Sequence, residues 1–203
     1  MIRFFDFIFS LMGILVLMPV FVVLYVAICM ESPGGGIYRQ KRVGRYGRDF
    51  FLDKFRSMRT GADKQGLITV GGRDPRITRM GYFIRKYKLD ELPQLFNVLL
   101  GDMSLVGPRP ELPHFVEQFK ETIPRYMVKH QVRPGITGWA QINGRDELEI
   151  PVKAKLDGEY VEKQGFLMDV KCFFGTIVSV LKSDGVVEGG TGELHKQEEK
   201  VSK

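Results

Sequence analysis

The N-terminal apolar run constrains the fold more than any other feature of this chain. From Phe7 to Met30 there is no charged residue, and Leu, Val, Ile, Phe and Met dominate. A run of about 20 apolar residues is long enough to cross the hydrocarbon of a bilayer. A cleaved signal peptide fits poorly, because the run is too long and no small-x-small cleavage site follows it. We therefore expect residues 1–32 to form a retained membrane anchor.

Pro19 lies near the middle of this run and leaves two topologies open. A proline inside a helix lacks an N–H donor and clashes with the preceding turn, so it kinks or breaks the helix. Cytoplasmic loops collect Lys and Arg, which predicts that the domain after the anchor lies inside the cell. The basic residues after the anchor are Arg39, Lys41, Arg42, Arg45 and Arg48, and Arg3 flanks its other end. A re-entrant hairpin with both ends on one side and a kinked single span both agree with this pattern.

The charge of the remaining chain indicates the chemistry of its partner. The 203 residues leave room for one sizeable domain beside the anchor, and the formal net charge is +6. A basic chain suggests an anionic partner: nucleic acid, anionic lipid or a phosphorylated substrate. The two cysteines, Cys29 and Cys172, have no metal or redox spacing. We expect a disulfide-free domain that faces the cytosol.

Several partner and enzyme classes do not fit the residues. The basic residues are not interleaved with aromatic ones, as a nucleic-acid stacking surface would require, so we expect no nucleic-acid partner. The chain contains no Walker A loop, no Gly-x-Ser-x-Gly elbow and no HExxH motif. The three histidines lack the spacing of zinc ligands.

The hydrophobic pattern predicts an α fold with minor β, in which short helices and one small β-hairpin are joined by long irregular loops. The strands are expected at residues 37–43 and 50–55, around a turn at 44–47. Extended or irregular chain is expected at 104–113 and 130–145, and a mobile loop at 60–74. Helices are expected at 76–87, from about 90 to 101, and at 114–120, 151–163 and 167–181. We assign residues 33–182 to a cytosolic catalytic domain and 183–203 to a polar, disordered tail.

Asp90 and Glu91 are adjacent carboxylates in the stretch KLDELPQLFNVLLGD, and Pro93 follows them. Proline is tolerated in the first turn of a helix, so a helix should begin near Asp90. The positive end of a helix dipole favours ionised carboxylates, which can hold Mg²⁺ or attack phosphorus. The structural alternative is that Asp90 only caps the helix and Glu91 supports it. The dipeptide alone favours the capping interpretation, so the case for the catalytic one depends on the rest of the chain.

Arginines recur at the ends of the predicted helices and in the loops. Guanidinium groups match phosphate oxygens in a bidentate manner, so arginines near a carboxylate pair favour phosphate recognition. Arg109 and Arg145 are the strongest candidates, because each lies in a stiff loop bounded by Pro or Gly, GPRP and NGR. Most of the others are expected to be solvated surface charge.

Ordered blocks along the chain resemble a known family. They are KFRSM (54–58), RKYKLDELPQL (85–95), GDMS (101–104), GPRP (107–110), VRPGITG (132–138) and NGR (143–145). With the apolar helix and its central proline, these blocks resemble small monotopic phosphoglycosyl transferases of the bacterial sugar transferase superfamily. The resemblance extends from Arg3 to about Leu181.

The resemblance implies a reaction. Such enzymes transfer a sugar-1-phosphate from a UDP-sugar to polyprenol (undecaprenyl) phosphate and release UMP, which starts glycoconjugate assembly. It also implies Mg²⁺ as cofactor, membrane phospholipid as a partner and the cytoplasmic face of the bacterial inner membrane as location. Self-association into a homo-oligomer is left open. The rival interpretations are a non-catalytic membrane scaffold on the same fold and a membrane-bound nucleotide-sugar phosphohydrolase.

The resemblance also implies roles for single residues. Asp90 would be the nucleophile that forms a phosphosugar-aspartyl intermediate in ping-pong kinetics, and Glu91 would bind Mg²⁺. The substrate-binding residues would be Lys54, Arg85, Pro108, Arg109 and Arg145. The family favours the re-entrant hairpin, although this chain has Met18 where many members have a serine before the membrane proline.

Overall fold

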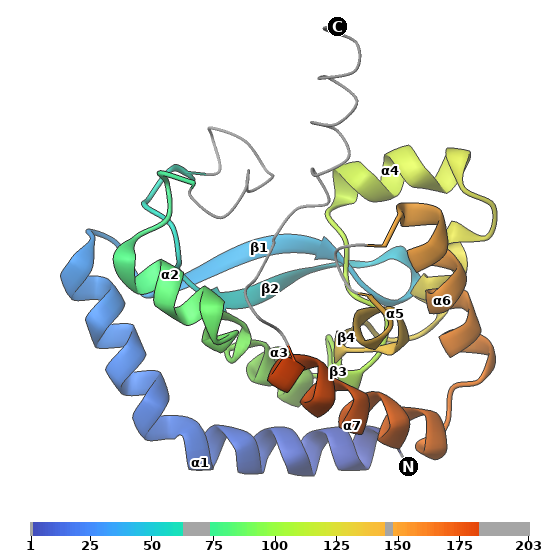
Figure 1. Cartoon of the computed structure of the whole chain (residues 1–203), viewed down its shortest axis with the longest axis horizontal. Coiled ribbons are helices and arrows are strands. Elements are labelled where there is room, and N and C mark those ends of the chain that lie inside the picture. Colours follow the sequence, from blue (N-terminus) through green and yellow to red (C-terminus); the bar gives the residue numbers. More distant parts are fainter. Residues whose placement is uncertain (1, 63–73, 145–147, 183–203) are drawn as a thin grey trace, which may run out of the picture.

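The computed structural model describes residues 2–62, 74–144 and 148–182 (Figure 1). Most of the predicted loop at 60–74, the candidate residue Arg145 and the predicted tail lie outside the described residues. The fold class is as predicted: helices dominate, and two small two-stranded sheets accompany them. The domain bounds at residues 32 and 182 stay predictions.

α1 (Ile2–Glu31) is one helix that continues through Pro19 and is visibly bent along its length (Figure 1). An interior proline removes a helical hydrogen bond, which accounts for such a bend. Only one stripe of α1 is buried, and it consists of Asp6, Ser10, Ile14, Phe21, Leu24 and Ile28. Within the described ranges α1 is the one helix long and apolar enough to cross a membrane, judged by length and composition.

The first turns of α1 are fixed to the globular domain by polar contacts. The Arg3 guanidinium donates to the backbone carbonyl of Leu99, at the end of α3, over 2.7 Å. The buried Asp6 carboxylate accepts a hydrogen bond from Ser104 Oγ (2.8 Å) and one from the backbone N–H of Leu105 (3.0 Å). The N-terminal end of the apolar helix therefore lies against the domain.

The last turns of α1 are fixed to the same domain. Glu31 accepts from the backbone N–H groups of Arg79 (2.8 Å) and Met80 (2.9 Å), the first two residues of α2 (Arg79–Lys86). Arg56 donates to the backbone carbonyl of Ser32 over 2.8 Å. Both ends of a 30-residue helix thus contact one domain, as a re-entrant hairpin requires.

β1 (Ile37–Val43) and β2 (Asp49–Phe55) form the predicted antiparallel hairpin. The turn between them contains a short 3₁₀ helix, η1 (Arg45–Gly47). Exposed and half-buried residues alternate along β1, so one face of the hairpin is turned toward the domain. Phe55 at the end of β2 packs with Phe21, Leu24 and Ile28 of α1 and Ile84 of α2.

The region around the carboxylate pair differs from the prediction in two ways. α2 begins at Arg79 with Thr78 as its N-cap, three residues after the predicted start, because Asp74 forms a turn with Arg76 instead. The predicted helix from Asp90 is divided into a 3₁₀ turn, η3 (Leu89–Glu91), and α3 (Gln94–Leu100). Pro93 is the N-cap of α3. At this position the backbone N–H makes no hydrogen bond within the helix, so proline, which lacks the N–H, is tolerated.

A second sheet was not predicted. β3 (Ser104–Val106) pairs in parallel with β4 (Gly135–Thr137). Both strands lie in segments that we expected to be extended or irregular. A Cβ on Gly135 would lie 2.1 Å from the backbone N of Gly107, so only glycine permits this close approach. The connection between the strands contains α4 (Pro113–Thr122) and η4 (Tyr126–Gln131), and the short α5 (Trp139–Ile142) follows β4.

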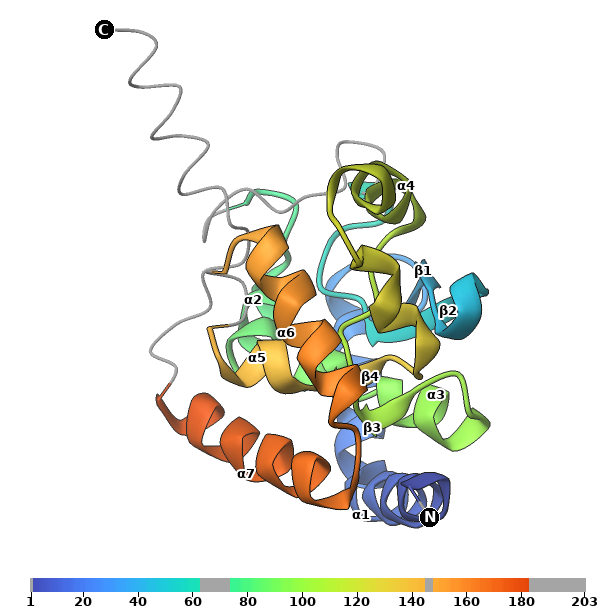
Figure 2. The same cartoon turned by 90° about the vertical axis from the view of Figure 1, so that its right-hand side faces the viewer.

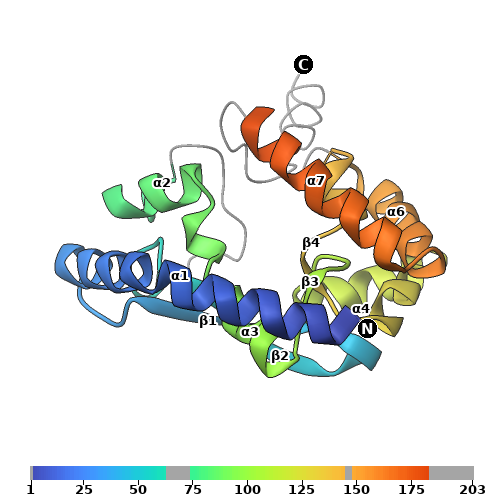
Figure 3. The ribbon, with the colours of Figure 1, turned by 90° about the horizontal axis from the view of Figure 1, so that it is seen from below.

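The two final helices agree closely with the prediction: α6 (Ile150–Glu162) and α7 (Phe166–Lys182). The buried Tyr160 hydroxyl of α6 donates to the carbonyl of Val106 in β3 (3.1 Å) or to the carboxylate of Asp169 in α7 (2.7 Å). This hydroxyl joins three elements. α1 and α7 lie along the same face of the molecule (Figures 2 and 3), and the rings of Phe5 and Phe166 are 6.1 Å apart.

Candidate active site

The turn between α2 and α3 is η3, which carries both candidate carboxylates. Lys88, the residue before η3, has a φ of 57° in the left-handed region, and this sharp turn sets the direction of the next residues. Asp90 is 5% exposed and Glu91 9%. The capping interpretation is wrong, because the N-caps of η3 and α3 are Lys88 and Pro93. Burial of two adjacent carboxylates requires compensating positive charge nearby.

Glu91 has that compensation from two cations. Its Oε1 accepts from Lys54 Nζ over 3.3 Å and from Arg109 Nη2 over 2.7 Å. Arg109 Nη1 lies 3.5 Å from Oε2, so the guanidinium faces the carboxylate with both of its terminal nitrogens. Lys54 comes from the end of β2 and Arg109 from the loop after β3. Lys54, Glu91 and Arg109, which we predicted from the sequence to share one site, are therefore in contact, although they come from distant parts of the chain.

The loop that carries Arg109 is held by its own backbone. The N–H of Gly107 donates to the carbonyl of Thr137 (2.7 Å), and the N–H of Gly135 donates to the carbonyl of Pro108 (2.9 Å). The candidate residue Pro108 is buried, and its carbonyl serves this contact. These bonds extend the β3–β4 pairing up to Arg109. They hold the backbone from which the Arg109 side chain projects.

Arg42 is a residue of this region that the sequence interpretation missed as part of the site. Its Nη1 donates to the carbonyl of Pro110 over 2.9 Å, directly beside Arg109. The pKa of Arg42 is lowered to about 10, mainly by burial and also by the Arg109 guanidinium, while Glu111 and Glu91 act in the opposite direction. In the structure the alternation of β1 places Arg42 on the half-buried face. The sequence carries no clear signal for this, because polar residues fall on both faces of the strand. Arg42 adds a third cation to the surroundings of Glu91.

Of the other two candidate residues, the structure describes Arg85. Arg85 lies in the last turn of α2, and its Nε donates to Ser57 Oγ over 2.9 Å. This bond holds the guanidinium against the segment that follows β2. Arg145 lies outside the described residues. The substrate-binding roles of both residues stay predictions.

A buried ion cluster lies just after Arg109 along the chain, at Glu111. Lys129 Nζ lies 3.1 Å from Asp157 of α6 and 3.8 Å from Glu111. Burial by itself would lower the pKa of Lys129, but the two carboxylates outweigh it and raise the pKa, so the amine stays charged. The cluster fastens the chain just after Arg109 to α6.

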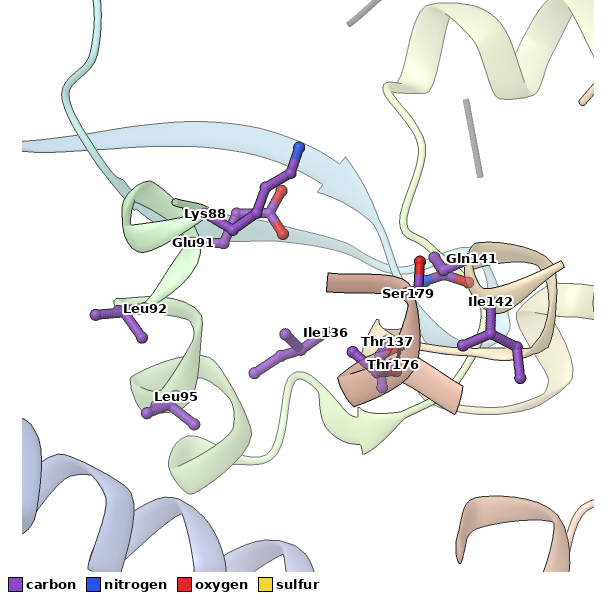
Figure 4. Close-up of a pocket in the computed structure, with 10 residues that line it drawn as sticks. All are labelled: Lys88, Glu91, Leu92, Leu95, Ile136, Thr137, Gln141, Ile142, Thr176 and Ser179. Atoms are coloured by element: carbon purple, nitrogen blue, oxygen red, sulfur yellow. Dashed lines mark hydrogen bonds between the residues drawn. The ribbon is translucent and has the colours of Figure 1, made fainter. Parts of the chain in front are cut away.

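A cavity opens beside the carboxylate turn (Figure 4). Its volume is about 180 Å³. Leu92, Leu95 and Ile136 form one apolar side, and polar side chains from β4, α5 and α7 form the other: Thr137, Gln141, Thr176 and Ser179. Lys88 and Glu91 line the cavity at its charged end. The site therefore combines a carboxylate pair, cations suited to phosphate oxygens and an adjoining small cavity.

Comparison with known proteins gives a consistent result. Residues 1–183 match the sequence model of the family described as bacterial sugar transferase. The chain is 43% identical over 183 residues to a UDP-N-acetylgalactosamine-undecaprenyl-phosphate N-acetylgalactosaminephosphotransferase of Aeromonas hydrophila. It is 40% identical over 177 residues to a UDP-glucose:undecaprenyl-phosphate glucose-1-phosphate transferase of Escherichia coli (strain K12). It is also 41% identical over 191 residues to an exopolysaccharide production protein of Rhizobium leguminosarum bv. phaseoli.

The matched regions differ in how much of each relative they cover. The alignments include 89%, 85% and 88% of this chain, respectively. They cover 43% and 38% of the Aeromonas and Escherichia proteins but 94% of the Rhizobium protein. The chain thus spans about two fifths of the length of the first two relatives.

Proposed function

Because this chain belongs to the bacterial sugar transferase family, as its sequence resemblance predicted, we propose that it transfers a sugar-1-phosphate from a UDP-sugar to polyprenol phosphate and releases UMP. The observation that carries the proposal is the ion-paired carboxylate turn. Asp90 and Glu91 are buried together, and Lys54 and Arg109 lie at Glu91. Such cations can neutralise the oxygens of a diphosphate, which would otherwise repel an attacking carboxylate. The Aeromonas and Escherichia relatives act on undecaprenyl phosphate according to their names.

Asp90 is the proposed nucleophile. Its carboxylate oxygen forms a bond to the phosphorus that carries the sugar, while the bond from that phosphorus to the bridging oxygen breaks. UMP leaves with the electron pair of the broken bond. In the second half-reaction an oxygen of polyprenol phosphate attacks the same phosphorus and the Asp90 carboxylate is released, so the sugar-1-phosphate passes to the lipid. Covalent catalysis of this kind replaces one difficult displacement by two easier ones.

Lys54 and Arg109 have a positioning and charge-balancing role in both half-reactions. In the substrate-free protein they balance Glu91, from which they lie 3.3 Å and 2.7 Å. When a diphosphate enters, its oxygens offer the same cations a second anionic partner. The low exposure of the carboxylates strengthens these interactions relative to those in water.

The donor set fits Mg²⁺, which the family implies. In the described part of the chain no cluster of three or more His, Cys, Asp or Glu residues could hold a metal. Magnesium in phosphoryl-transfer sites needs only one or two carboxylates, because substrate phosphates and water complete its coordination. Glu91, with Asp90 beside it, would hold the ion. When bound, Mg²⁺ would neutralise charge on the diphosphate.

The membrane is the proposed second partner, with the catalytic domain at the cytoplasmic face of the bacterial inner membrane. The exposed side of α1 is apolar along its whole length, with Phe4, Leu15, Val16 and Val23 each more than 60% exposed. α7, on the same face of the molecule (Figure 3), exposes Phe166, Leu167, Phe173, Phe174, Ile177 and Val178. Two neighbouring apolar helices would bring the site to the level where a polyprenol phosphate group emerges.

A non-catalytic scaffold is disfavoured because Asp90, Glu91, Lys54 and Arg109 are all retained. A phosphohydrolase, in contrast, would use the same first step and pass the intermediate to water. The test is to measure UMP release by the full chain in lipid nanodiscs, with and without undecaprenyl phosphate. We expect at most one UMP per enzyme without the lipid and multiple turnovers with it, and no release by Asp90→Asn. Continuous lipid-independent release would identify a hydrolase, and turnover by Asp90→Asn would contradict the proposed nucleophile.

Metal removal tests the role of Glu91 separately. We expect excess EDTA to abolish UMP release and added Mg²⁺ to restore it, because the carboxylates and the diphosphate otherwise repel one another. Undiminished release in EDTA would show that Lys54 and Arg109 suffice without a metal.

A further inference from the structure

Gln141 of α5 is a buried amide at the edge of the proposed active site. It is 9% exposed and lines the cavity that Glu91 and Lys88 also line (Figure 4). Among the described residues, neither its Nε2 nor its Oε1 has a hydrogen-bond partner, and both atoms are buried. A buried amide that lacks partners destabilises a fold, so native proteins contain few of them. A ligand that completes these bonds would explain why the amide is there.

The two threonine hydroxyls of this wall already have hydrogen-bond partners. The hydroxyls of Thr137 and Thr176 lie 2.5 Å apart, and Thr176 Oγ1 lies 2.7 Å from the carbonyl of Cys172. These bonds join α7 to β4 and form a rigid wall. Gln141 therefore stands out on this wall, because it offers one donor group and one acceptor side by side.

The size of the cavity limits what it can hold. A volume of about 180 Å³ is below the roughly 300–1,000 Å³ of pockets that enclose a whole drug-sized ligand. The cavity therefore suits one part of a nucleotide sugar. Its opposite side is apolar, with Leu92, Leu95 and Ile136, and favours a flat or weakly polar group against it.

We propose that this cavity binds an amide-type group of the nucleotide sugar and that Gln141 is its hydrogen-bonding partner; this inference rests on the proposed function. The Gln141 Nε2 donates to a carbonyl of that group, and the Gln141 Oε1 accepts from its N–H. Two parts of a UDP-sugar have this chemistry: the imide of uracil and the 2-acetamido group of an N-acetylated sugar. A prenyl chain has neither donor nor acceptor and would leave the amide as it is.

The test compares Gln141→Leu with wild type in the full chain in nanodiscs. Leucine has a similar size but no hydrogen-bonding group. Gln118→Leu is the matched control, because the same change is made at an exposed position on α4. The probes are UMP, whose binding is followed by calorimetry, and UDP-GlcNAc and UDP-glucose, whose KM values are measured by UMP release.

The proposal predicts one of two patterns for Gln141→Leu. If uracil is the ligand, UMP binds about tenfold more weakly and the KM values of both UDP-sugars rise by a similar factor. If the acetamido group is the ligand, only the KM of UDP-GlcNAc rises and UMP binding stays unchanged. In both cases the melting temperature stays the same or rises, because an unsatisfied buried amide has been removed.

Other results would overturn the inference. These are unchanged binding of all three probes, a rise confined to the KM of polyprenol phosphate, or a fall in melting temperature that Gln118→Leu does not share. Failure of the proposed function would look different, because wild type itself would then release no UMP from any UDP-sugar.

Discussion

At the scale of single residues, Glu91 is held between two cations from distant parts of the chain. Lys54 is 17% exposed, Arg109 32% and Glu91 10%, measured on the side chains. Removal of one partner from an ion pair with so little water around it is costly, because the other charge stays buried without compensation. The same cations are positioned for the oxygens of a diphosphate. Their loss should therefore affect the reaction as well as the fold.

Replacement of Arg109 by alanine tests this double role. We expect kcat/KM for UMP release to fall by about 100-fold, the usual effect of removing one positioned charge-stabilising group. Arg109→Lys should recover only part of the rate, since lysine cannot offer two parallel donors. Arg125→Ala is the matched control, because Arg125 forms an exposed ion pair with Glu162. Equal effects of Arg109→Ala and Arg125→Ala would contradict the assignment.

Sequence motifs were informative about some of these residues and silent about others. Lys54, Glu91 and Arg109 were proposed for one site, and the structure brings them together. Gln141 carries no local signal, because its burial depends on the packing of α5 against α6 and α7. Arg42 was noted only as positive charge after the membrane anchor, because polar residues fall on both faces of β1 and do not mark which face is buried.

At the scale of secondary-structure elements, the N-terminal part of α1 is joined to β3 by a buried carboxylate. Asp6 is 4% exposed and accepts from Ser104 and from the backbone of Leu105. These bonds compensate a charge that would otherwise be costly in an apolar helix. They also fix the position of the helix relative to the strand that leads to Arg109.

Asp6→Ala should therefore destabilise the protein rather than change its chemistry. We expect the free energy of unfolding in detergent micelles to fall by about 1–3 kcal/mol, because the Ser104 hydroxyl and the Leu105 N–H lose their acceptor. Glu121→Ala removes an exposed carboxylate on α4 and should have no comparable effect. If both variants unfold alike, Asp6 does not hold the helix.

The elements that were predicted correctly have local signals, and the missed ones do not. The β1–β2 hairpin follows from alternation around a Gly-bounded turn, and α6 and α7 follow from helical periodicity. β3 and β4 are strands of three residues, paired from about 30 positions apart. Their pairing depends on the close approach of Gly107 and Gly135, which no local pattern announces. η3 was missed because the turn at Lys88 requires a positive φ from a residue that rarely adopts one.

At the scale of the whole molecule, a long apolar helix begins and ends on the same domain. Arg3 and Asp6 attach its beginning and Glu31 its end. A helix that crossed the bilayer would carry one of these ends to the opposite side. In the bent form seen in Figure 1 both ends of α1 stay with the domain, and α1 and α7 lie along one face of the molecule (Figure 3). A single-leaflet arrangement is the topology that this geometry favours.

Cysteine labelling tests that topology in cells. Ile2→Cys and Glu117→Cys, each made after replacement of Cys29 and Cys172, mark the N-terminus and the catalytic domain. We expect neither to react with a membrane-impermeant maleimide in intact spheroplasts and both to react after permeabilisation. Labelling of Ile2→Cys from outside, with Glu117→Cys protected, would instead establish a full span.

The covalent intermediate on Asp90 is the central claim, and intact-mass spectrometry tests it most directly. The full chain is incubated with an accepted UDP-sugar and Mg²⁺ but without polyprenol phosphate. We predict a mass increase of one sugar-1-phosphate less one water, located on the peptide that contains Asp90, absent from Asp90→Asn and lost when polyprenol phosphate is added. Lipid-dependent UMP release without any adduct, or an adduct that persists in Asp90→Asn, would contradict it.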